Sequence, residues 1–525
     1  MSSQPYRRSS KKKSRKNKAP SLGVWLGLFA GACLVAATIW GVSRFISGRP
    51  AGSDVAGSDT GPASNSDLTG SSSFDYVAQL DQQQAAGATP ENNLAVVIAR
   101  VGGSGQATPE AHAQFEKRLG VSVPRESQSR LTMDQFHQSV RNMSTFQYTP
   151  WRVDHYPEAE QYLESIRSEL DQFVTDSEQC SHFYWPRIAD RTTEGMKYAP
   201  ASSINASHVG TLRVVAQALA VRSLMNYQRG ERLNAQRDAL ASLRLGNFMS
   251  LGRLSVEQVG ASCRTHALRA LLPIVNSDQV TREQLIEIEN LVSQIPANAP
   301  SDVDIVNSER IMMLDVATAI QTQGMGVLTP ESEGPTPNIP ISLLAADKVD
   351  YDVARKVVNR WVDRVQAEVA IVRSANARNT ALLALDAEVK AVINASPSQA
   401  KNRTEAGERL GNTVFVTQSY FSLFLNTRAT YETYRELLLL VIKFRKSALD
   451  GNALPQTLSE FLGEAPPRDR FTGDELVYRL GEVRGQVIIY SRGTNGTDDG
   501  GKMPFGNWIS HDDLGMITYW YGSPF

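Results

Sequence analysis

Residues 218–246 read ALAVRSLMNYQRGERLNAQRDALASLRLG, and this stretch decides the fold class. On either side of Gly230, apolar and small residues recur at spacings of three and four, which is the period of one face of an α-helix. Glycine often ends a helix because it adopts left-handed backbone angles without strain, so Gly230 marks a stop. The pattern predicts two antiparallel helices, over 209–227 and 231–251.

This pair resembles one helical hairpin of the tetratricopeptide type, with the small residues Ala235 and Ala239 where the two helices would touch. Arrays of that type need about three stacked units to bury a continuous core, and only one copy is visible here. We therefore expect an isolated helical hairpin inside a larger helical domain. The same periodicity predicts further helices at 151–174, 257–274, 281–294, 301–322, 350–392, 399–426 and 428–449.

Changes of composition set the limits of the domains. Helical periodicity extends from 74 to 462, with a Gly- and Pro-rich interruption at 323–340 that predicts a surface loop or a hinge. In 463–525 the pattern becomes extended, and the β-prone runs at 476–480 and 486–490 flank a short polar turn. The expected fold class is mainly α, with a small C-terminal β-hairpin element.

The N-terminal region predicts a membrane anchor. Residues 22–42 carry no charged side chain over 21 positions, and a helix of that length spans ~31 Å, the thickness of a hydrocarbon core. Residues 1–21 contain eight basic side chains, whereas only Arg44 and Arg49 follow closely after the apolar segment. Because cytoplasmic flanks carry the excess of Lys and Arg, we expect a single-pass protein of the inner (cytoplasmic) membrane, with residues 1–21 in the cytoplasm and the bulk outside it.

Other interpretations of this region fit less well. A cleaved signal peptide has a shorter apolar stretch before its small-x-small site, and several apolar residues follow the matching run at 30–32. Cys33 stands where a bacterial lipoprotein would be processed, but the Leu usual three positions earlier is missing. Basic runs also bind nucleic acid, yet topology and attraction to anionic lipids explain the tail more simply, so we expect no nucleic-acid partner.

Two features extend the anchor model. Gly23, Gly27 and Gly31 recur every four residues on one face of the apolar segment, a spacing that lets two membrane helices approach closely. This face predicts a homodimer, although glycines without a partner are also common in membrane helices. Residues 43–73 are rich in Gly, Ser, Asp and Pro and poor in large apolar groups, so we expect a flexible linker that reaches roughly 30 Å.

Cysteine and histidine form no recognisable catalytic motif. Cys180 and Cys263 fall in the part expected outside the cytoplasm, where a disulfide is permitted but its formation depends on their unknown separation. Cys263 and His266 are three residues apart in a helical stretch, which suits either a nucleophile with its base or simple neighbours on one helix face. His182 precedes the aromatic run 183–185, which favours a histidine packed among rings. The sequence therefore gives no positive support for an enzyme.

Near the C-terminus, Pro466–Gly473 (PPRDRFTG) is followed by Val477–Arg479 (VYR), Tyr490–Gly496 (YSRGTNG) and Asp498–Gly501 (DDGG). Together with the helix expected before them, these motifs resemble the C-terminal hairpin of the major pseudopilins of type II secretion. Arg470 departs from that pattern, because a proline is usual after this aspartate. The apolar N-terminal segment also lacks the prepilin processing site, so the resemblance does not extend to polymerisation into a pilus.

In pseudopilins the aspartate-rich loop binds calcium, so the resemblance implies a Ca²⁺ site in this chain. Ca²⁺ takes six to eight oxygen ligands and tolerates irregular loops. A solvated acidic turn without metal is the alternative interpretation. The side chains that would supply oxygen ligands are Asn495, Asp498, Asp499, Asp512 and Asp513.

The longer pattern, from Pro90–Ala95 (PENNLA) through the helical hairpins to this ending, resembles a family of large, uncharacterised bacterial envelope proteins. The sequence thus favours a membrane-tethered extracytoplasmic scaffold that binds another envelope protein, linked to a secretion or pseudopilin-like assembly. An exported, membrane-anchored hydrolase is the alternative. An enzyme needs a deep pocket with converging titratable groups, whereas a scaffold needs a broad apolar surface.

The expected topology can be tested directly with reporter fusions placed after Phe525. A reporter that is active only outside the cytoplasm should be active, and a cytoplasmic reporter should be silent, because the basic flank holds the N-terminus inside. The reverse pattern would contradict the export of the helical domain.

Overall fold

A computed structural model of the chain describes residues 81–520, except 83–84, 107, 127–131, 141–149, 187, 189–206, 250–253, 295–300, 324–348, 372, 396–399, 419–420 and 502–512. The basic tail, the apolar segment with Gly23, Gly27 and Gly31, the linker at 43–73 and Asp512 lie outside the described residues. So does nearly all of the expected interruption at 323–340. Among the helices that are described, none is both long and apolar enough to cross a membrane.

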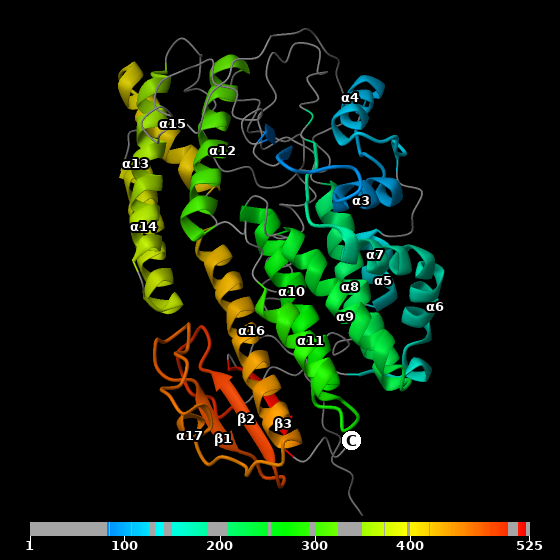
Figure 1. Cartoon of the computed structure of the whole chain (residues 1–525). Coiled ribbons are helices and arrows are strands. Elements are labelled where there is room, and N and C mark those ends of the chain that lie inside the picture. The colour runs from blue at the N-terminus through cyan, green and yellow to red at the C-terminus, as the bar shows by residue number, and fades with distance from the viewer. Residues whose placement is uncertain are drawn as a thin grey trace, which may run out of the picture.

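The described chain is mainly helical and carries a small antiparallel sheet near its C-terminal end, as the sequence predicts (Figure 1). The elements are α3 (Leu94–Gly102), α4 (Pro109–Leu119), α5 (Met133–Val140), η2 (Val153–His155), α6 (Pro157–Ser165), α7 (Arg167–Gln179), α8 (Ser207–Gln228), α9 (Arg232–Met249), α10 (Leu254–Val275), α11 (Arg282–Ser293), α12 (Asp302–Gln323), α13 (Tyr351–Ala370), α14 (Ala375–Ala395), α15 (Arg403–Gln418), α16 (Phe421–Leu449), α17 (Leu458–Leu462), β1 (Val477–Leu480), β2 (Gln486–Ser491) and β3 (Leu514–Tyr519).

The expected hairpin is formed by α8 and α9. Gly230 has a φ of +82° in the turn between them, and its N–H donates to the carbonyl of Tyr227. Ala235 and Ala239 of α9 are fully buried. Across the two helices, the Ser223 hydroxyl donates to the carbonyl of Ala235 at 2.7 Å. The small residues therefore lie at a close helix contact, which confirms the hairpin.

Several of the expected helix boundaries are wrong. The helix expected over 399–426 is divided, since α15 ends at Gln418 and α16 begins at Phe421. The 350–392 segment is not one helix, because Ile371 adopts an extended backbone after α13, and α14 begins at Ala375. The Ala375 N–H donates to the carbonyl of Arg470 at 2.7 Å, so a contact distant in sequence fixes where α14 starts. Conversely, α16 continues through position 427, where the sequence predicted a boundary but contains neither Gly nor Pro.

The helix expected over 151–174 is also divided. It begins only at Pro157, and α6 ends at Ser165, because the next residue, Ile166, has a φ of −119° that lies outside the helical region. The Ile166 side chain is fully buried, so tertiary packing outweighs helix propensity at this position.

The C-terminal sheet has the strand order β1-β2-β3, with both pairs antiparallel. The predicted hairpin is confirmed, since Val477 of β1 pairs with Tyr490 of β2. The third strand, β3, was not predicted, and it pairs with β2 from Gln486↔Tyr519 to Ser491↔Leu514. It packs against α16, which covers one face of the sheet (Figure 1).

Arg445 of α16 holds the sheet to the helices. It is buried, and its guanidinium donates to the carbonyls of Val275 at 3.3 Å, Ser277 at 3.1 Å and Tyr519 at 2.5 Å. The Asn276 side chain donates to the carbonyl of Ile517 at 2.8 Å, on the same strand. The end of α10 and the last strand are therefore joined through one buried cation.

The buried apolar side chains form two separate hydrophobic cores. The first belongs to what we call the main body, which comprises α3–α11, the C-terminal part of α16, α17 and the sheet. The second belongs to the α12–α15 body, which also contains the first turn of α16. In Figure 1 the α12–α15 body lies on one side of α16, and α8–α11 lie on the other. Helix α16 is thus the element common to both cores.

Glycines allow α15 to lie very close to α13. A Cβ added at Gly411 would stand 2.5 Å from the Ala354 carbonyl oxygen, and one added at Gly407 would stand 2.2 Å from that of Asp350. Both contacts involve backbone atoms, which cannot move aside without shifting a helix. Close backbone approach therefore sets the α13–α15 spacing.

We expect Gly411→Ala to destabilise the protein by about 1–3 kcal/mol, because the new methyl group overpacks this contact. Gly210→Ala is the matched control, since its Cβ would meet nothing within 4 Å on helix α8. Alanine favours a helix over glycine, so the control should be neutral or slightly stabilising. Thermal unfolding of the two variants, followed by circular dichroism, checks this difference. Equal melting midpoints would contradict the packing described.

Candidate functional site

The turn that precedes the sheet is organised by Asp469, the aspartate of the PPRDRFTG motif. Its carboxylate is buried and accepts from the Ser491 hydroxyl at 2.7 Å and from the Phe471 N–H at 2.8 Å. Its second oxygen accepts from the Arg492 N–H at 2.8 Å. Three charge-assisted bonds satisfy the buried charge and fasten the turn to the end of β2. Asp469 is therefore a structural aspartate.

The acidic loop after β2 is organised by Asp498. One carboxylate oxygen accepts from the Tyr490 hydroxyl at 2.8 Å and from the Gly500 N–H at 2.9 Å. The other accepts from the Arg479 guanidinium of β1 at 2.8 Å. The hydrogen bond from Tyr490 is the largest cause that holds the pKa of Asp498 below its usual range. Both oxygens of Asp498 are thus bonded within the protein.

The other predicted calcium ligands lie in different environments. Asp499 accepts from the Asn495 side chain at 3.2 Å within the loop. Asp513 is fully buried at the start of β3, where one of its oxygens accepts from the Gly501 N–H at 2.8 Å. Burial raises the pKa of Asp513. The structure brings these side chains into one loop region, and Asp512 lies outside the described residues.

The side chains predicted to bind calcium are not gathered into one cluster among the described residues. Over the described part of the chain, no three His, Cys, Asp or Glu side chains are grouped closely enough to hold a metal ion. Asp498 forms an ion pair with Arg479. The calcium site implied by the pseudopilin resemblance stays a prediction.

The Cys263 and His266 pair of α10 is unsuited to nucleophilic catalysis. Burial raises the pKa of the Cys263 thiol to about 12 and lowers the pKa of His266 to about 3. Both side chains are buried and uncharged near neutral pH, whereas a catalytic thiol must ionise. Cys180 is also a free thiol, so the structure contains no bridge between Cys180 and Cys263.

The aromatic cluster after His182 uses a different histidine from the one expected. His208 stacks on Trp185, with ring centroids 4.4 Å apart, and also contacts Phe183. His182 is only partly buried, and its ring bonds the neighbouring Ser181 hydroxyl at 2.8 Å. The cluster packs through a residue 26 positions beyond His182, which no local pattern could reveal.

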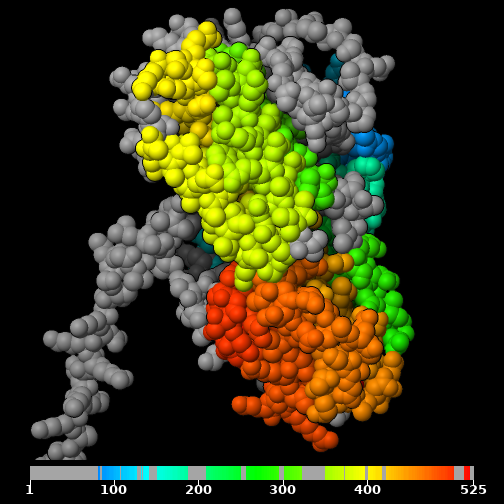
Figure 2. All heavy atoms as spheres, turned by 90° about the vertical axis from the view of Figure 1, so that its left-hand side faces the viewer, coloured from blue at the N-terminus to red at the C-terminus, as the bar shows by residue number. Residues whose placement is uncertain are grey.

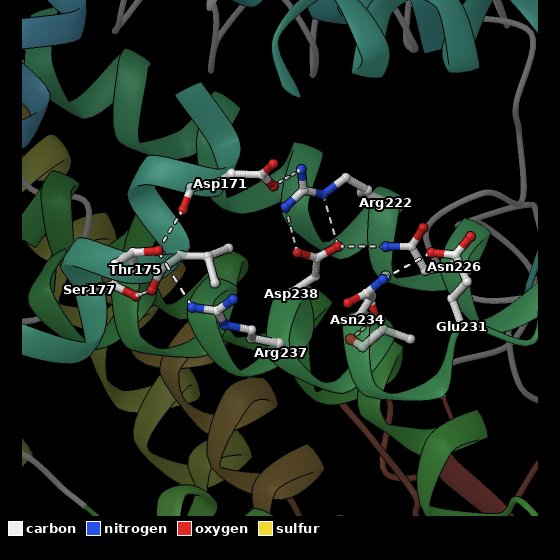
Figure 3. A network of polar contacts seen from close by, with 12 residues as sticks. Asp171, Thr175, Ser177, Arg222, Asn226, Glu231, Asn234, Arg237 and Asp238 are labelled. Atoms are coloured by element: carbon white, nitrogen blue, oxygen red, sulfur yellow. Dashed lines mark hydrogen bonds and ion pairs between the residues drawn. The ribbon is translucent and has the colours of Figure 1, made fainter. Parts of the chain in front are cut away.

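A buried polar network joins α7, α8 and α9 (Figure 3). Arg222 of α8 binds Asp238 of α9 through two nitrogens, at 2.6 and 2.9 Å, and binds Asp171 of α7 at 2.7 Å. The Asn226 side chain adds a bond to Asp238 at 3.0 Å. Burial raises the pKa of Asp238 to about 6, against the opposing effect of the Arg222 guanidinium. Sequence reasoning missed this network, although both charged residues stand among apolar residues of the opening stretch.

The fold and these contacts define the structural class of the protein. It is a mainly helical protein with a small antiparallel C-terminal sheet, in which the charged groups named above hold elements together. Comparison with protein-family models, with curated proteins and with solved structures found no match.

We expect Asp498→Asn to destabilise the fold by at most about 1 kcal/mol, because it weakens the exposed contact with Arg479. If Asp498 acts only through its protein partners, the loss should be the same in millimolar Ca²⁺ and in chelator. Asp499→Asn is the matched control and should have a smaller effect. Chemical denaturation under both conditions provides the measurement. A loss confined to Ca²⁺ would show that the aspartate acts through the metal.

A second prediction concerns acid stability. Because the pKa of His266 is lowered to about 3 in the folded state, the unfolded state takes up the proton first as the pH falls below about 6.5. The free energy of unfolding should therefore fall on acidification from pH 7 to pH 5, by up to about 1.4 kcal/mol per pH unit. His266→Leu should reduce this dependence, whereas the exposed control His155→Gln should retain it. Equal slopes for all three proteins would contradict the burial of an uncharged histidine.

Proposed function

We propose that the chain is a membrane-tethered extracytoplasmic scaffold of the bacterial envelope, whose helical body binds another envelope protein. The observation that supports a scaffold most directly is that several of its carboxylates bind other groups of the protein. Asp238, Asp469 and Asp498 are each bonded to several groups of the protein itself. Carboxylates engaged in this way fix helices and strands in place, and none is poised to act on a substrate.

The proposed tether rests on the sequence. The uncharged segment at 22–42, its basic flank and the linker at 43–73 support a single-pass anchor that holds the body outside the cytoplasm. Gly23, Gly27 and Gly31 support association of two copies through the span. In this proposal the membrane positions the body and the body selects the partner.

One observation disfavours the hydrolase alternative. Cys263 and His266, the pair closest to a catalytic arrangement in the sequence, are buried and uncharged.

The proposed link to a secretion or pseudopilin-like assembly rests on the C-terminal sheet. The motifs that resemble pseudopilins supply the turn around Asp469 and the contact of Tyr490 with Asp498. They therefore serve to hold one sheet and its loop in a fixed shape. A fixed sheet of this kind suits recognition of another protein of the same assembly.

The proposal can be tested by cross-linking in cells, followed by purification from membranes and mass spectrometry. The full-length tagged protein should recover a defined set of envelope proteins. The control is a fusion of residues 1–73 to an unrelated folded domain, which keeps the anchor and removes the body. Asp469→Ala, which removes three bonds that organise the sheet, should reduce recovery of partners that bind through it.

Equal recovery of the same proteins with the control fusion would contradict the proposal, because the body would then have no part in binding. Recovery of no protein, combined with turnover of an envelope substrate by the purified chain, would favour the hydrolase alternative.

A further inference from the structure

The junction between the two bodies lacks the hydrophobic core that fills the interior of each body. Figure 2 shows the helices α13–α15 above the C-terminal elements, with a boundary between the two groups of atoms. Among the described residues, the two sets of buried apolar side chains that form the cores have no member in common. The two bodies therefore meet without a continuous hydrophobic core.

Helix α16 passes from one body to the other. Phe424 and Leu425 belong to the α12–α15 core, whereas Leu437 and Leu438 belong to the main core. The intervening segment 426–433 has the sequence NTRATYET. Its Ala429 is buried but belongs to neither core, and its Tyr431 is half-buried against the main core. The joint thus contains one uninterrupted helix whose middle is largely polar.

Around this segment, charged side chains of four elements form what we call the ionic joint. It comprises Asp302 of α12, Arg378 of α14, Arg428 and Glu432 of α16, and Arg470 of the turn before the sheet. Asp302 binds Arg378 at 3.0 Å and Arg428 at 2.8 Å. Glu432 binds Arg428 at 3.3 Å and Arg470 at 2.8 Å. Each ion pair shares a residue with the next, so the chain of charges crosses the junction without a break.

The ionic joint is partly solvated. The exposed fractions of its side chains run from 19% for Arg378 to 42% for Arg470. Fully exposed ion pairs contribute about 0–1 kcal/mol each and half-buried pairs somewhat more, whereas complete burial of one Leu or Phe side chain contributes about 1.5–3 kcal/mol. Each body is therefore held together more strongly than the two bodies are held to each other.

A few hydrogen bonds complete the junction. The Ala375 and Asn376 N–H groups, at the start of α14, donate to the carbonyls of Arg470 and Phe471. The Asn376 side chain donates to the carbonyl of Gly493 at 3.2 Å. Bonds of this kind contribute about 0.5–1.5 kcal/mol each and can be exchanged for bonds to water. Polar interfaces between bodies of one chain commonly permit relative motion.

We propose that the α12–α15 body changes its orientation relative to the main body about residues 426–433 of α16, and that the ionic joint is the latch that holds the observed orientation. Arg428 is the central element of the latch, because it bridges Asp302 and Glu432. This inference does not depend on the proposed scaffold function. It assigns to the fold a way to present two arrangements of its surface to a partner.

The test uses pulsed electron spin resonance on the full-length protein in detergent micelles, with Cys33→Ser, Cys180→Ser and Cys263→Ala as background. Spin labels at Leu233→Cys of α9 and Leu383→Cys of α14, which are 71% and 52% exposed, report the distance between the bodies. Two further label pairs report the integrity of each body: positions 233 and 480 in the main body, and positions 383 and 401 in the α12–α15 body.

Arg428→Met opens the latch, and we expect it to widen the distance distribution between the bodies at least twofold. Both pairs within a body should keep narrow distributions. Arg364→Met is the matched control, because it removes the ion pair with Glu388, which lies within the α12–α15 body. That control should leave the distribution between the bodies unchanged.

An unchanged distribution between the bodies in Arg428→Met would overturn the proposal. Broadening of the pairs within a body in that variant would overturn it as well, since the charges would then stabilise a single folded unit.

Discussion

Burial of α16 on two sides is the constraint on which the rest of the structure depends. Its C-terminal part places Leu437, Leu438 and Val441 in the main core, against α10 and α11. Its first turn places Phe424 in the core of the α12–α15 body. The sheet packs on the same helix and is fastened to it by Arg445, so the position of every C-terminal element follows from the course of α16.

Buried ion pairs in the main body join particular helices. The Arg222 and Asp238 pair joins the two helices of the hairpin, and Arg264 pairs with Glu257 at 2.6 Å beneath the ring of Tyr431. Ion pairs of this kind add little net stability compared with apolar residues, but removal of one partner leaves an uncompensated buried charge. These ion pairs therefore contribute mainly to the orientation and register of the helices that they join. Apolar packing specifies those features less strictly. The ion pairs thereby fix the positions of neighbouring helices within the main body.

Local patterns predicted the mainly helical class and several of its elements, but they missed α3–α5 and β3 and gave several helix boundaries wrongly. Periodicity of 3.6 residues identified the helical hairpin, and the β-prone runs around Gly481–Gly485 identified the β1–β2 hairpin. The start of α14 could not be predicted, because a bond to the carbonyl of Arg470 fixes it from far along the chain. The same reason applies to the acidic loop. Asp498 of this loop pairs with Arg479 of β1, nineteen positions earlier in the chain, and no local pattern indicates that contact.

The central claim is that two separate cores share α16. Differential scanning calorimetry of two core variants of the full-length protein tests this claim most directly. Phe424→Ala and Leu438→Ala each remove a fully buried side chain, at a cost of about 2–5 kcal/mol. Two unfolding transitions are predicted for the parent protein. Phe424→Ala should lower chiefly the transition of the α12–α15 body, and Leu438→Ala chiefly that of the main body. A single transition that both variants lower equally would contradict the account.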